Sequence, residues 1–456
     1  MAEAFTTSDP FTATLLATYP VHTDTEIERM LAASREAYDV HRATSFADRA
    51  RLMTRLAELL GEREAELSAL MTSEMGKPIL QAKAEIQKCA SVCRYYADHA
   101  EEHLADETVE TGASRAVVAY QPIGTILAIM PWNFPFWQVF RFAAPNLMAG
   151  NVGILKHASN VLGCGFAIEQ LFEDAGFPAG AFQHVVVDHD RLAKVIEDDR
   201  VRGVTLTGSD RAGRAVASRA GQHLKKTVLE LGGTDAFIVL ADADLGHAVE
   251  TAVTARVQNN GQSCIAAKRF ILEEPVAEAF TAQFVIRMAR LAVGDPADEN
   301  TDVGPLARED LRDELHDQVQ RSVDQGAKLL TGGHILDGDG YLYPPTVLAD
   351  VRPGMVPFEE ELFGPVASVS VVASADEAVE WANASRLGLG GAVFTGDRQR
   401  GEAIARRLEC GCAFVNEMVK SHPAVPFGGV KDSGYGRELG RHGILEFVNA
   451  KTIWVE

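Results

Sequence analysis

The stretch VTLTGSDRAGRAVASRAGQHLKKTVLELGG, residues 204–233, carries the clearest signal of fold class in this chain of 456 residues. Val204–Thr207 has the apolar and β-branched residues of a short strand, and Gly208-Ser209 then begins a helix predicted to run to residue 222. Thr227–Glu230 is predicted to be a second strand, which ends just before two glycines. A strand, a helix and another strand in succession predict a parallel sheet with helices on its faces.

The same alternation extends on both sides of this stretch. Three amphipathic helices are expected first, and further pairs of strand and helix follow from residue 152 onward. The predicted helices are 23–38, 46–72, 78–103, 161–175, 191–199, 208–222, 244–259 and 275–292, and the predicted strands are 115–120, 124–130, 152–155, 184–187, 204–207, 227–230, 236–240, 268–272, 363–372, 391–394, 413–416 and 447–455. Together these elements predict an α/β fold.

Composition narrows the classes of partner. Lys and Arg number 43 against 64 Asp and Glu, and the net charge of −21 disfavours nucleic acid or an anionic membrane as a partner. Residues 1–22 contain no Lys or Arg, so a secretory signal is not expected. The uncharged run 116–140 is long enough to span a bilayer, but its three prolines would interrupt a helix, and we interpret it as buried strand and loop.

The six cysteines have spacings that fit neither a zinc site nor a secreted disulfide framework. No metal site and a reducing, cytoplasmic compartment are therefore expected. One of them, Cys264, follows the polar run Asn259-Asn260-Gly261-Gln262-Ser263. A buried structural cysteine would more often lie among Leu, Ile and Val. This context favours a nucleophilic thiol.

Two further side chains would complete a site for thioester chemistry. Glu230 precedes two glycines and could activate a water, although a solvated turn is the simpler interpretation of that residue alone. Asn133 lies between aromatic residues and prolines, where a buried amide needs a hydrogen-bond partner. It could stabilise an oxyanion, or simply fix its loop. If the three groups converge, the protein oxidises aldehydes.

Three features point to a cofactor that carries phosphate. Gly208-Ser209 leads a strand into a helix, whose free N–H groups suit a pyrophosphate, although Gly-Ser there is often only a cap. Lys156 ends a strand and precedes His157-Ala158-Ser159. A glutamate of the segment Glu359–Pro365 could bind ribose hydroxyls, or belong to a solvated acidic turn.

Together these motifs resemble the aldehyde dehydrogenase superfamily over nearly the whole chain. The motifs PWNFP, LTGS, LELGG, GQSC, ELFGP and PFGGVKDSGYGRE occur in the family's order. The resemblance implies an α/β fold with two parallel-sheet domains and a small oligomerisation β-hairpin. The implied parts are a Rossmann-like cofactor domain over 1–109 and 126–232, a catalytic domain over 233–432, and an oligomerisation element over 110–125 and 433–456.

The resemblance also assigns roles to residues. Cys264 would be the nucleophile, Glu230 the general base and Asn133 the oxyanion donor. The cofactor site would include Trp132, Lys156, His157, Ser159, Gly208, Ser209, Leu231, Glu361 and Phe363. A homodimer or a homotetramer is expected.

Within the superfamily the chain resembles bacterial succinate-semialdehyde dehydrogenases in the stretches FWQVFRFAAP, LKHASN and NNGQSCIAAKRF. This likeness implies that Arg141 and Ser421 bind the carboxylate of the aldehyde, a role that suits the planar fork of a guanidinium. The alternative for Arg141 is an ion pair on a helix surface, but the uncharged run 116–140 before it favours a partly buried location. Ser159 stands where relatives that prefer NAD often carry glutamate, which would repel a 2′-phosphate. NADP is therefore favoured, with NAD possible.

Three other functions stay open at this point. A dehydrogenase that transfers the acyl group to coenzyme A would not need Glu230 as a base. A binding protein without catalytic activity would not need the Cys, Glu and Asn set. A dehydrogenase of broad specificity would not need a partner for a substrate carboxylate.

Overall fold

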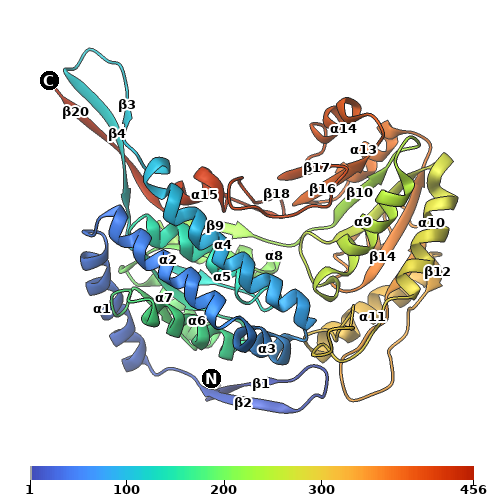
Figure 1. Ribbon diagram of the computed structural model, residues 1–456, viewed down its shortest axis with the longest axis horizontal. Helices are drawn as coiled ribbons and strands as arrows, with labels where there is room; N and C mark the ends of the chain where they lie inside the picture. Colours follow the sequence, from blue (N-terminus) through green and yellow to red (C-terminus); the bar gives the residue numbers. More distant parts are fainter. Residues whose placement is uncertain (1–2) are drawn as a thin grey trace.

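Two mainly parallel sheets form the centres of two lobes in the computed structural model, which describes residues 3–456 (Figure 1). The sheet of the first lobe has six strands in the order β19-β9-β8-β5-β6-β7, and only the edge strand β19 is antiparallel to its neighbour. Its strands are β5 (Thr125–Ile129), β6 (Val152–Lys156), β7 (Phe182–His184), β8 (Val201–Thr207), β9 (Lys226–Glu230) and β19 (Gly434–Tyr435).

The sheet of the second lobe has seven strands in the order β12-β13-β14-β11-β10-β16-β17, with only β12 antiparallel to its neighbour. Its strands are β10 (Asp235–Val239), β11 (Ala267–Glu273), β12 (Lys328–Thr331), β13 (Thr346–Ala349), β14 (Val366–Val372), β16 (Gly390–Phe394) and β17 (Cys412–Val415). The predicted α/β class with two parallel-sheet units is confirmed.

Helices cover both sheets, and local signals fix several of their starts. Thr23 and Glu26 form a capping box at the first helix, and the Ser209 hydroxyl accepts a hydrogen bond from the Ala212 N–H at the helix after β8. The first lobe contains α1 (Asp24–His41), α2 (Phe46–Glu62), α3 (Glu64–Met75), α4 (Ile79–His103), α5 (Trp137–Met148), α6 (Leu162–Asp174), α7 (His189–Glu197), α8 (Asp210–Gln222) and α15 (Gly440–Leu445).

The second lobe contains α9 (Leu245–Val257), the short 3-10 helix η1 (Gln258–Gly261), α10 (Glu274–Ala289), α11 (Glu309–Asp324), α12 (Val356–Glu359), α13 (Ala375–Asn383) and α14 (Arg398–Ala405). Across residues 3–456, no helix is both long and apolar enough to cross a membrane. In the same range, no group of three or more His, Cys, Asp or Glu is placed to hold a metal ion.

Three smaller sheets connect or extend the lobes. The hairpin of β1 (Ala4–Ser8) and β2 (Leu15–Pro20) reaches from the first lobe to the second, where the Tyr341 N–H donates to the Pro10 carbonyl. β15 (Leu387–Gly388) pairs with β18 (Val430–Lys431). β3 (Glu107–Thr108), β4 (Arg115–Pro122) and β20 (Val448–Val455) form a sheet that projects away from both lobes (Figure 1).

The structure differs from the sequence predictions in a few places. The run 116–140 is not only strand and loop, because the helix α5 begins at Trp137. The predicted strand 184–187 is displaced, since β7 ends at His184. The helical stretch 46–72 is divided at Arg63 into α2 and α3. Within 433–456, β19 joins the sheet of the first lobe, and only β20 belongs to the projecting sheet.

Candidate active site

The loop that carries Cys264 has an unusual backbone, which its side chains hold in place. Asn259 and Asn260 both have a φ of +57°, and Gly261 follows with +73°. A Cβ at Gly261 would lie 2.4 Å from the Gly364 backbone, so only glycine fits there. The Asn260 amide donates to the Gly76 and Pro305 carbonyls at 2.7 and 2.9 Å. These bonds anchor the loop to both lobes.

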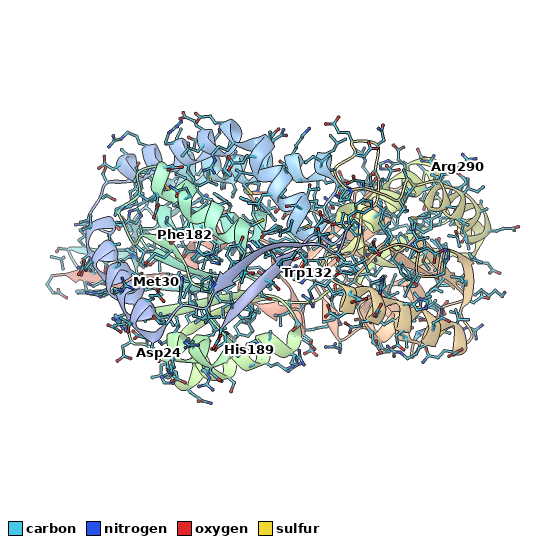
Figure 2. All side chains as sticks on the ribbon, turned by 90° about the horizontal axis from the view of Figure 1, so that it is seen from below. Asp24, Met30, Trp132, Phe182, His189 and Arg290 are labelled. Atoms are coloured by element: carbon cyan, nitrogen blue, oxygen red, sulfur yellow. The ribbon has the colours of Figure 1, made fainter. Side chains whose placement is uncertain are left out.

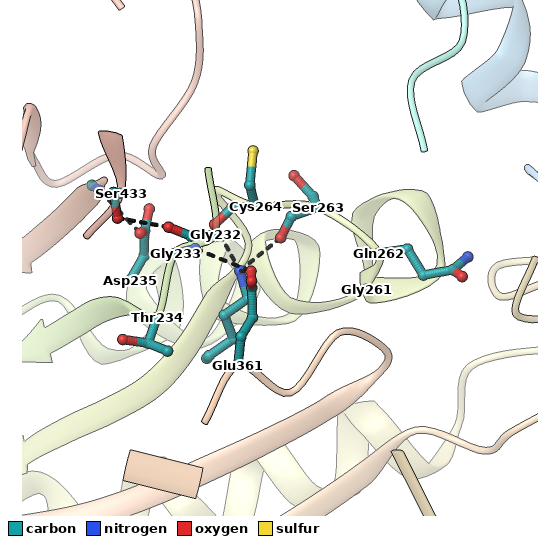
Figure 3. A network of polar contacts seen from close by, with 12 residues as sticks. Gly232, Gly233, Thr234, Asp235, Gly261, Gln262, Ser263, Cys264, Glu361 and Ser433 are labelled. Atoms are coloured by element: carbon teal, nitrogen blue, oxygen red, sulfur yellow. Dashed lines mark hydrogen bonds and ion pairs between the residues drawn. The ribbon is translucent and has the colours of Figure 1, made fainter. Parts of the chain in front are cut away.

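Lys268 holds the other end of the same loop. Its Nζ donates to the Ser263 and Cys264 carbonyls, both at 2.7 Å, and pairs with Glu361 at 2.9 Å. The side chain of Lys268 is fully buried, and the Cys264 thiol points away from Glu361 (Figure 3). A buried cation therefore fixes the backbone of Cys264, the predicted nucleophile, and does not contact its sulfur.

Asn133 lies against this loop. Its Nδ2 donates to the Gln262 carbonyl at 3.0 Å, and the Asn259 amide donates to the Asn133 carbonyl at 2.7 Å. The loop of Asn133 is itself fixed by Glu85, whose carboxylate accepts from the N–H groups of Phe136 and Trp137 at 3.0 and 2.9 Å. Asn133 and Cys264 are thus held together by bonds that do not depend on a substrate.

Cys264 and Asn133 line a cavity of about 710 Å³ between the two lobes. Trp132 also lines this cavity, and the view from below shows it where the two lobes meet (Figure 2). Burial raises the pKa of the Cys264 thiol to about 12, although the charges of Lys268 and Arg141 oppose that rise. The resting group is therefore a thiol.

Glu230 does not line this cavity. Its carboxyl is 2% exposed, and neither of its oxygens has a hydrogen-bond partner within residues 3–456. Burial raises its pKa well above the usual range, and the charge of Glu438 adds to the rise while Arg141 opposes it. Glu230 therefore lies beside other buried charged side chains and not at the wall of the cavity.

Arg141 forms a buried ion pair with Glu438, and its guanidinium lies 4.7 Å from the centre of the Phe427 ring. Arg141 is thus ion-paired on a helix, as the alternative interpretation has it, but the pair lies inside the protein and not on the helix surface. Ser421, the other predicted carboxylate ligand, accepts a hydrogen bond from the Lys88 Nζ at 2.8 Å. No direct bond joins Arg141 to Ser421 in the described part of the chain.

Six of the predicted cofactor residues line the 710 Å³ cavity: Trp132, Gly208, Ser209, Leu231, Glu361 and Phe363. The Gly208 N–H donates to the Glu230 carbonyl at 3.0 Å, and the Ser209 hydroxyl caps α8, so the N-terminus of that helix opens on the cavity. Trp132 and Phe363 meet edge to face, with ring centres 5.7 Å apart. A pocket with polar helix ends and apolar walls suits a dinucleotide.

The remaining three, Lys156, His157 and Ser159, lie outside the lining of that cavity. Lys156 ends β6, and burial lowers its pKa. His157 is buried, its Nε2–H donates to the Pro135 carbonyl at 2.9 Å, and its pKa is lowered to about 4. His157 therefore fixes the loop of Asn133, whereas the exposed Ser159 is accessible to a ligand.

The sequence did not point to Lys268, Glu85 or Lys88, which orient the site from a distance. Lys268 follows Cys264 by four residues and stands inside a buried strand, where an unpaired lysine is rare. That position was a usable signal. Glu85 and Lys88 lie on an ordinary amphipathic helix, and their partners are far away in the sequence.

A parallel α/β fold with a cysteine and an amide beside a dinucleotide-sized cavity describes an aldehyde-oxidising class of protein. The family model for the aldehyde dehydrogenase family matches residues 1–453, and the chain belongs to that family. The superfamily resemblance seen in the motifs is thereby confirmed.

Within this family, the chain is similar to several proteins that are named as succinate-semialdehyde dehydrogenases. The chain is 51% identical over 452 residues to a probable succinate-semialdehyde dehydrogenase (NADP(+)) of Synechocystis sp., covering 99% of this chain and 100% of that protein. It is 50% identical to succinate-semialdehyde dehydrogenase (NADP(+)) 1 of Mycobacterium tuberculosis, over 98% and 99% of the two chains. The crystal structure of succinic semialdehyde dehydrogenase from Streptococcus pyogenes in complex with NADP+ superposes with a TM-score of 0.97, at 37% identity over 99% and 100%.

Proposed function

We propose that this protein oxidises succinate semialdehyde to succinate with NADP+, through a thioester on Cys264. The observation that carries the proposal is the joint placement of Cys264 and Asn133 on a cavity that also presents the N-terminus of α8. Two relatives that share about half of their residues with this chain are named as NADP(+) succinate-semialdehyde dehydrogenases. These names support the choice of succinate semialdehyde as substrate and NADP+ as cofactor.

The first step uses the groups that the structure already holds in place. The Cys264 thiol gives its proton to water in the cavity as its sulfur adds to the aldehyde carbon, and the Asn133 Nδ2 and the Cys264 N–H donate to the oxygen that becomes negative. The cofactor, held by cavity residues such as Trp132, Ser209 and Glu361, would supply the acceptor for the hydride of that carbon, and the acyl group would then remain on the Cys264 sulfur. Lys268 fixes the carbonyl of Cys264, so the loop need not reorganise as charge develops.

The second step requires a base and a water. Glu230 lies among buried charges, and burial raises its pKa well above the usual range. To act as a base it must turn toward the cavity, where water restores the ordinary acidity of its carboxyl. Hydrolysis then releases the acid and regenerates the thiol.

The residues present fit NADP+. The cavity supplies a helix N-terminus for the pyrophosphate and Glu361 for ribose hydroxyls. Lys156 has no carboxylate within 4 Å among residues 3–456, and the exposed Ser159 is neutral. This pair would tolerate a 2′-phosphate, which a glutamate at position 159 would repel. NAD+ remains a possible second cofactor.

Ser421 and Arg141 are the proposed partners of the substrate carboxylate. Ser421 is available through its hydroxyl, whereas Arg141 would have to share its charge with Glu438. We also propose that the protein forms a homodimer or a homotetramer through the projecting sheet, because Trp454 at its end is 53% exposed. The cysteines of the chain are all free, which supports a reducing, cytoplasmic compartment.

The test is a spectrophotometric assay with succinate semialdehyde and NADP+. Formation of NADPH by the protein, and its loss in Cys264→Ala, is the expected result. Absence of NADPH with the unaltered protein, or an unchanged rate in Cys264→Ala, would contradict the proposal. Addition of coenzyme A should produce no acyl-CoA.

A further inference from the structure

The loop 131–137 separates two cavities. Pro131, Trp132 and Asn133 face the 710 Å³ cavity, which suits the cofactor. Phe134 and Trp137, a few residues further on, face a second cavity of about 480 Å³ between α4 and α9. When a dinucleotide fills the first cavity, the aldehyde must reach Asn133 and Cys264 from another side. The second cavity is the large space next to the same loop on the side of Phe134.

Lys88, on α4, lines this second cavity. Its Nζ lies 4.2 Å from the centre of the Trp137 ring and donates to the Ser421 hydroxyl at 2.8 Å. The side chain is half-buried, and burial, aided by the charge of Arg141, lowers its pKa to about 8. A lysine in such a place keeps its charge at neutral pH and is poorly solvated, so an anionic ligand would stabilise it.

Neighbouring cations already have acidic partners, and Lys88 does not. Lys77 pairs with Glu85, and Arg141 pairs with Glu438, both inside the protein. For Lys88, no carboxylate lies within 4 Å in residues 3–456, and its hydrogen bond there goes to the neutral Ser421. A half-buried cation that contacts only an aromatic ring and a neutral hydroxyl among the described residues has unused capacity to bind an anion.

The acidic residues of the second cavity do not fill that role. Glu85 is engaged by Lys77 and by the N-terminus of α5. Glu299 pairs with Lys83 at 2.7 Å, and Asp302 accepts a hydrogen bond from the Ala292 N–H at 2.8 Å. Glu85 and Glu299 are paired with lysines and Asp302 is hydrogen-bonded to the backbone, so none of the three is paired with Lys88.

We propose that Lys88 binds the carboxylate of the aldehyde substrate together with Ser421, and that it thereby selects carboxylated aldehydes over uncharged ones of the same length. This inference rests on the proposed oxidation of a semialdehyde and names a residue that determines its specificity. The apolar faces of Phe134 and Trp137 would contact the methylene chain. The serine hydroxyl, now an acceptor from Lys88, can donate to the carboxylate in turn.

The selectivity would depend on pH. Below pH 8 Lys88 is protonated and attracts the carboxylate, and above pH 8 the free enzyme loses that charge. The charged or titratable groups that influence it are Arg141, Lys77, Glu85 and Cys89. Of these, Arg141 and Lys77 are already ion-paired, and burial raises the pKa of Cys89 well above its usual range, so the thiol stays neutral over this pH interval.

The test compares kcat/KM for succinate semialdehyde with kcat/KM for butanal, both with NADP+. In Lys88→Gln the ratio of the two should fall at least about tenfold, since a charge-assisted hydrogen bond is lost. Lys88→Arg should stay within about threefold of the parent ratio, because it retains the charge. Arg94→Gln, which removes an exposed cation from the same helix, should leave the ratio unchanged. A Lys88→Gln ratio equal to that of the parent would overturn the inference.

A calorimetric titration with succinate gives a readout that does not depend on turnover. Succinate should bind the parent protein and Lys88→Arg, and should bind Lys88→Gln at least about tenfold more weakly. Equal affinity in all three overturns the role of Lys88 even if the parent is active. A parent that binds succinate through Lys88 yet forms no NADPH from the semialdehyde would instead contradict the proposed function and leave the carboxylate site in place.

Discussion

Replacing Lys268 by Met should destabilise the second lobe and loosen the nucleophile loop. The change removes the partner of Glu361 and leaves the Ser263 and Cys264 carbonyls without their donor. Breaking one side of a buried ion pair costs about 3–5 kcal/mol. The Glu361 side chain is 20% exposed, so water offsets part of that penalty, and the lower end, about 3 kcal/mol, applies.

The expected fall in melting temperature is about 6–12 °C, if each kcal/mol shifts a unit of the size of this lobe by about 2–4 °C. Calorimetry measures it directly. Lys328→Met is the matched control, because this lysine of the same sheet is 72% exposed and its pair with Asp350 lies on the surface. Its melting temperature should equal that of the parent.

A double variant, Lys268→Met with Glu361→Leu, separates electrostatics from packing. Both buried charges are then absent, so at least half of the lost stability should return. A double variant that unfolds at the same temperature as the single one would refute the reasoning. It would mean that the shape of the lysine, rather than its charge, maintains the loop.

Four more outcomes follow from the site. Asn133→Ala should lower kcat about 10²–10³-fold with little change in KM, as measured by steady-state kinetics; an unchanged kcat would exclude an oxyanion role. Ser159→Glu should reduce the preference for NADP+ over NAD+ at least about tenfold, and equal kinetics with both cofactors before and after the change would contradict this. Alkylation of Cys264 by iodoacetamide without cofactor should rise about tenfold per pH unit up to pH 10, because its pKa is about 12 and only the thiolate reacts; a plateau near pH 8 would disprove it. Glu230→Gln should give one equivalent of NADPH per site and then stop. Burial raises the pKa of Glu230 in the folded protein, so the folded state loses stability as the pH rises above the pKa of glutamate in the unfolded chain. Glu230→Gln removes this loss. The increase in melting temperature of Glu230→Gln over the parent should therefore be larger at pH 9 than at pH 5. An equal gain at both values would argue against that burial penalty.

Elements with a local signal could be predicted from the sequence. The capping box of Thr23 and Glu26 begins α1 where it was expected, and the apolar run before Gly208 is β8. By contrast, α5 has no helical periodicity to detect, since every residue from Trp137 to Met148 is buried. Val185–Val187 are apolar because they pack in the core beneath α1, although the ladder of β7 has already ended.

The site could be predicted in its composition but not in its arrangement. The motifs name Cys264, Asn133 and Glu230, because each stands beside glycines or prolines that mark a functional loop. The contacts that orient them join residues far apart in the chain, such as Lys88 with Ser421 across 333 positions. No local pattern specifies such a contact, because it arises only when two lobes fold against each other.

The ion pair of Arg141 bears on how Glu230, the proposed general base, can lie buried without a hydrogen-bond partner within residues 3–456. The guanidinium of Arg141 forms an ion pair with Glu438, and its charge opposes the rise in pKa of both Glu438 and Glu230. One positive charge can balance one carboxylate, and the ion pair assigns it to Glu438. Glu230 is therefore the carboxyl of the two that has no cation paired with it within residues 3–456, and burial raises its pKa well above the usual range. In the proposed mechanism Glu230 acts as a base only after its carboxyl turns from these buried charges toward the cavity, so the free energy of that motion would control the rate of thioester hydrolysis.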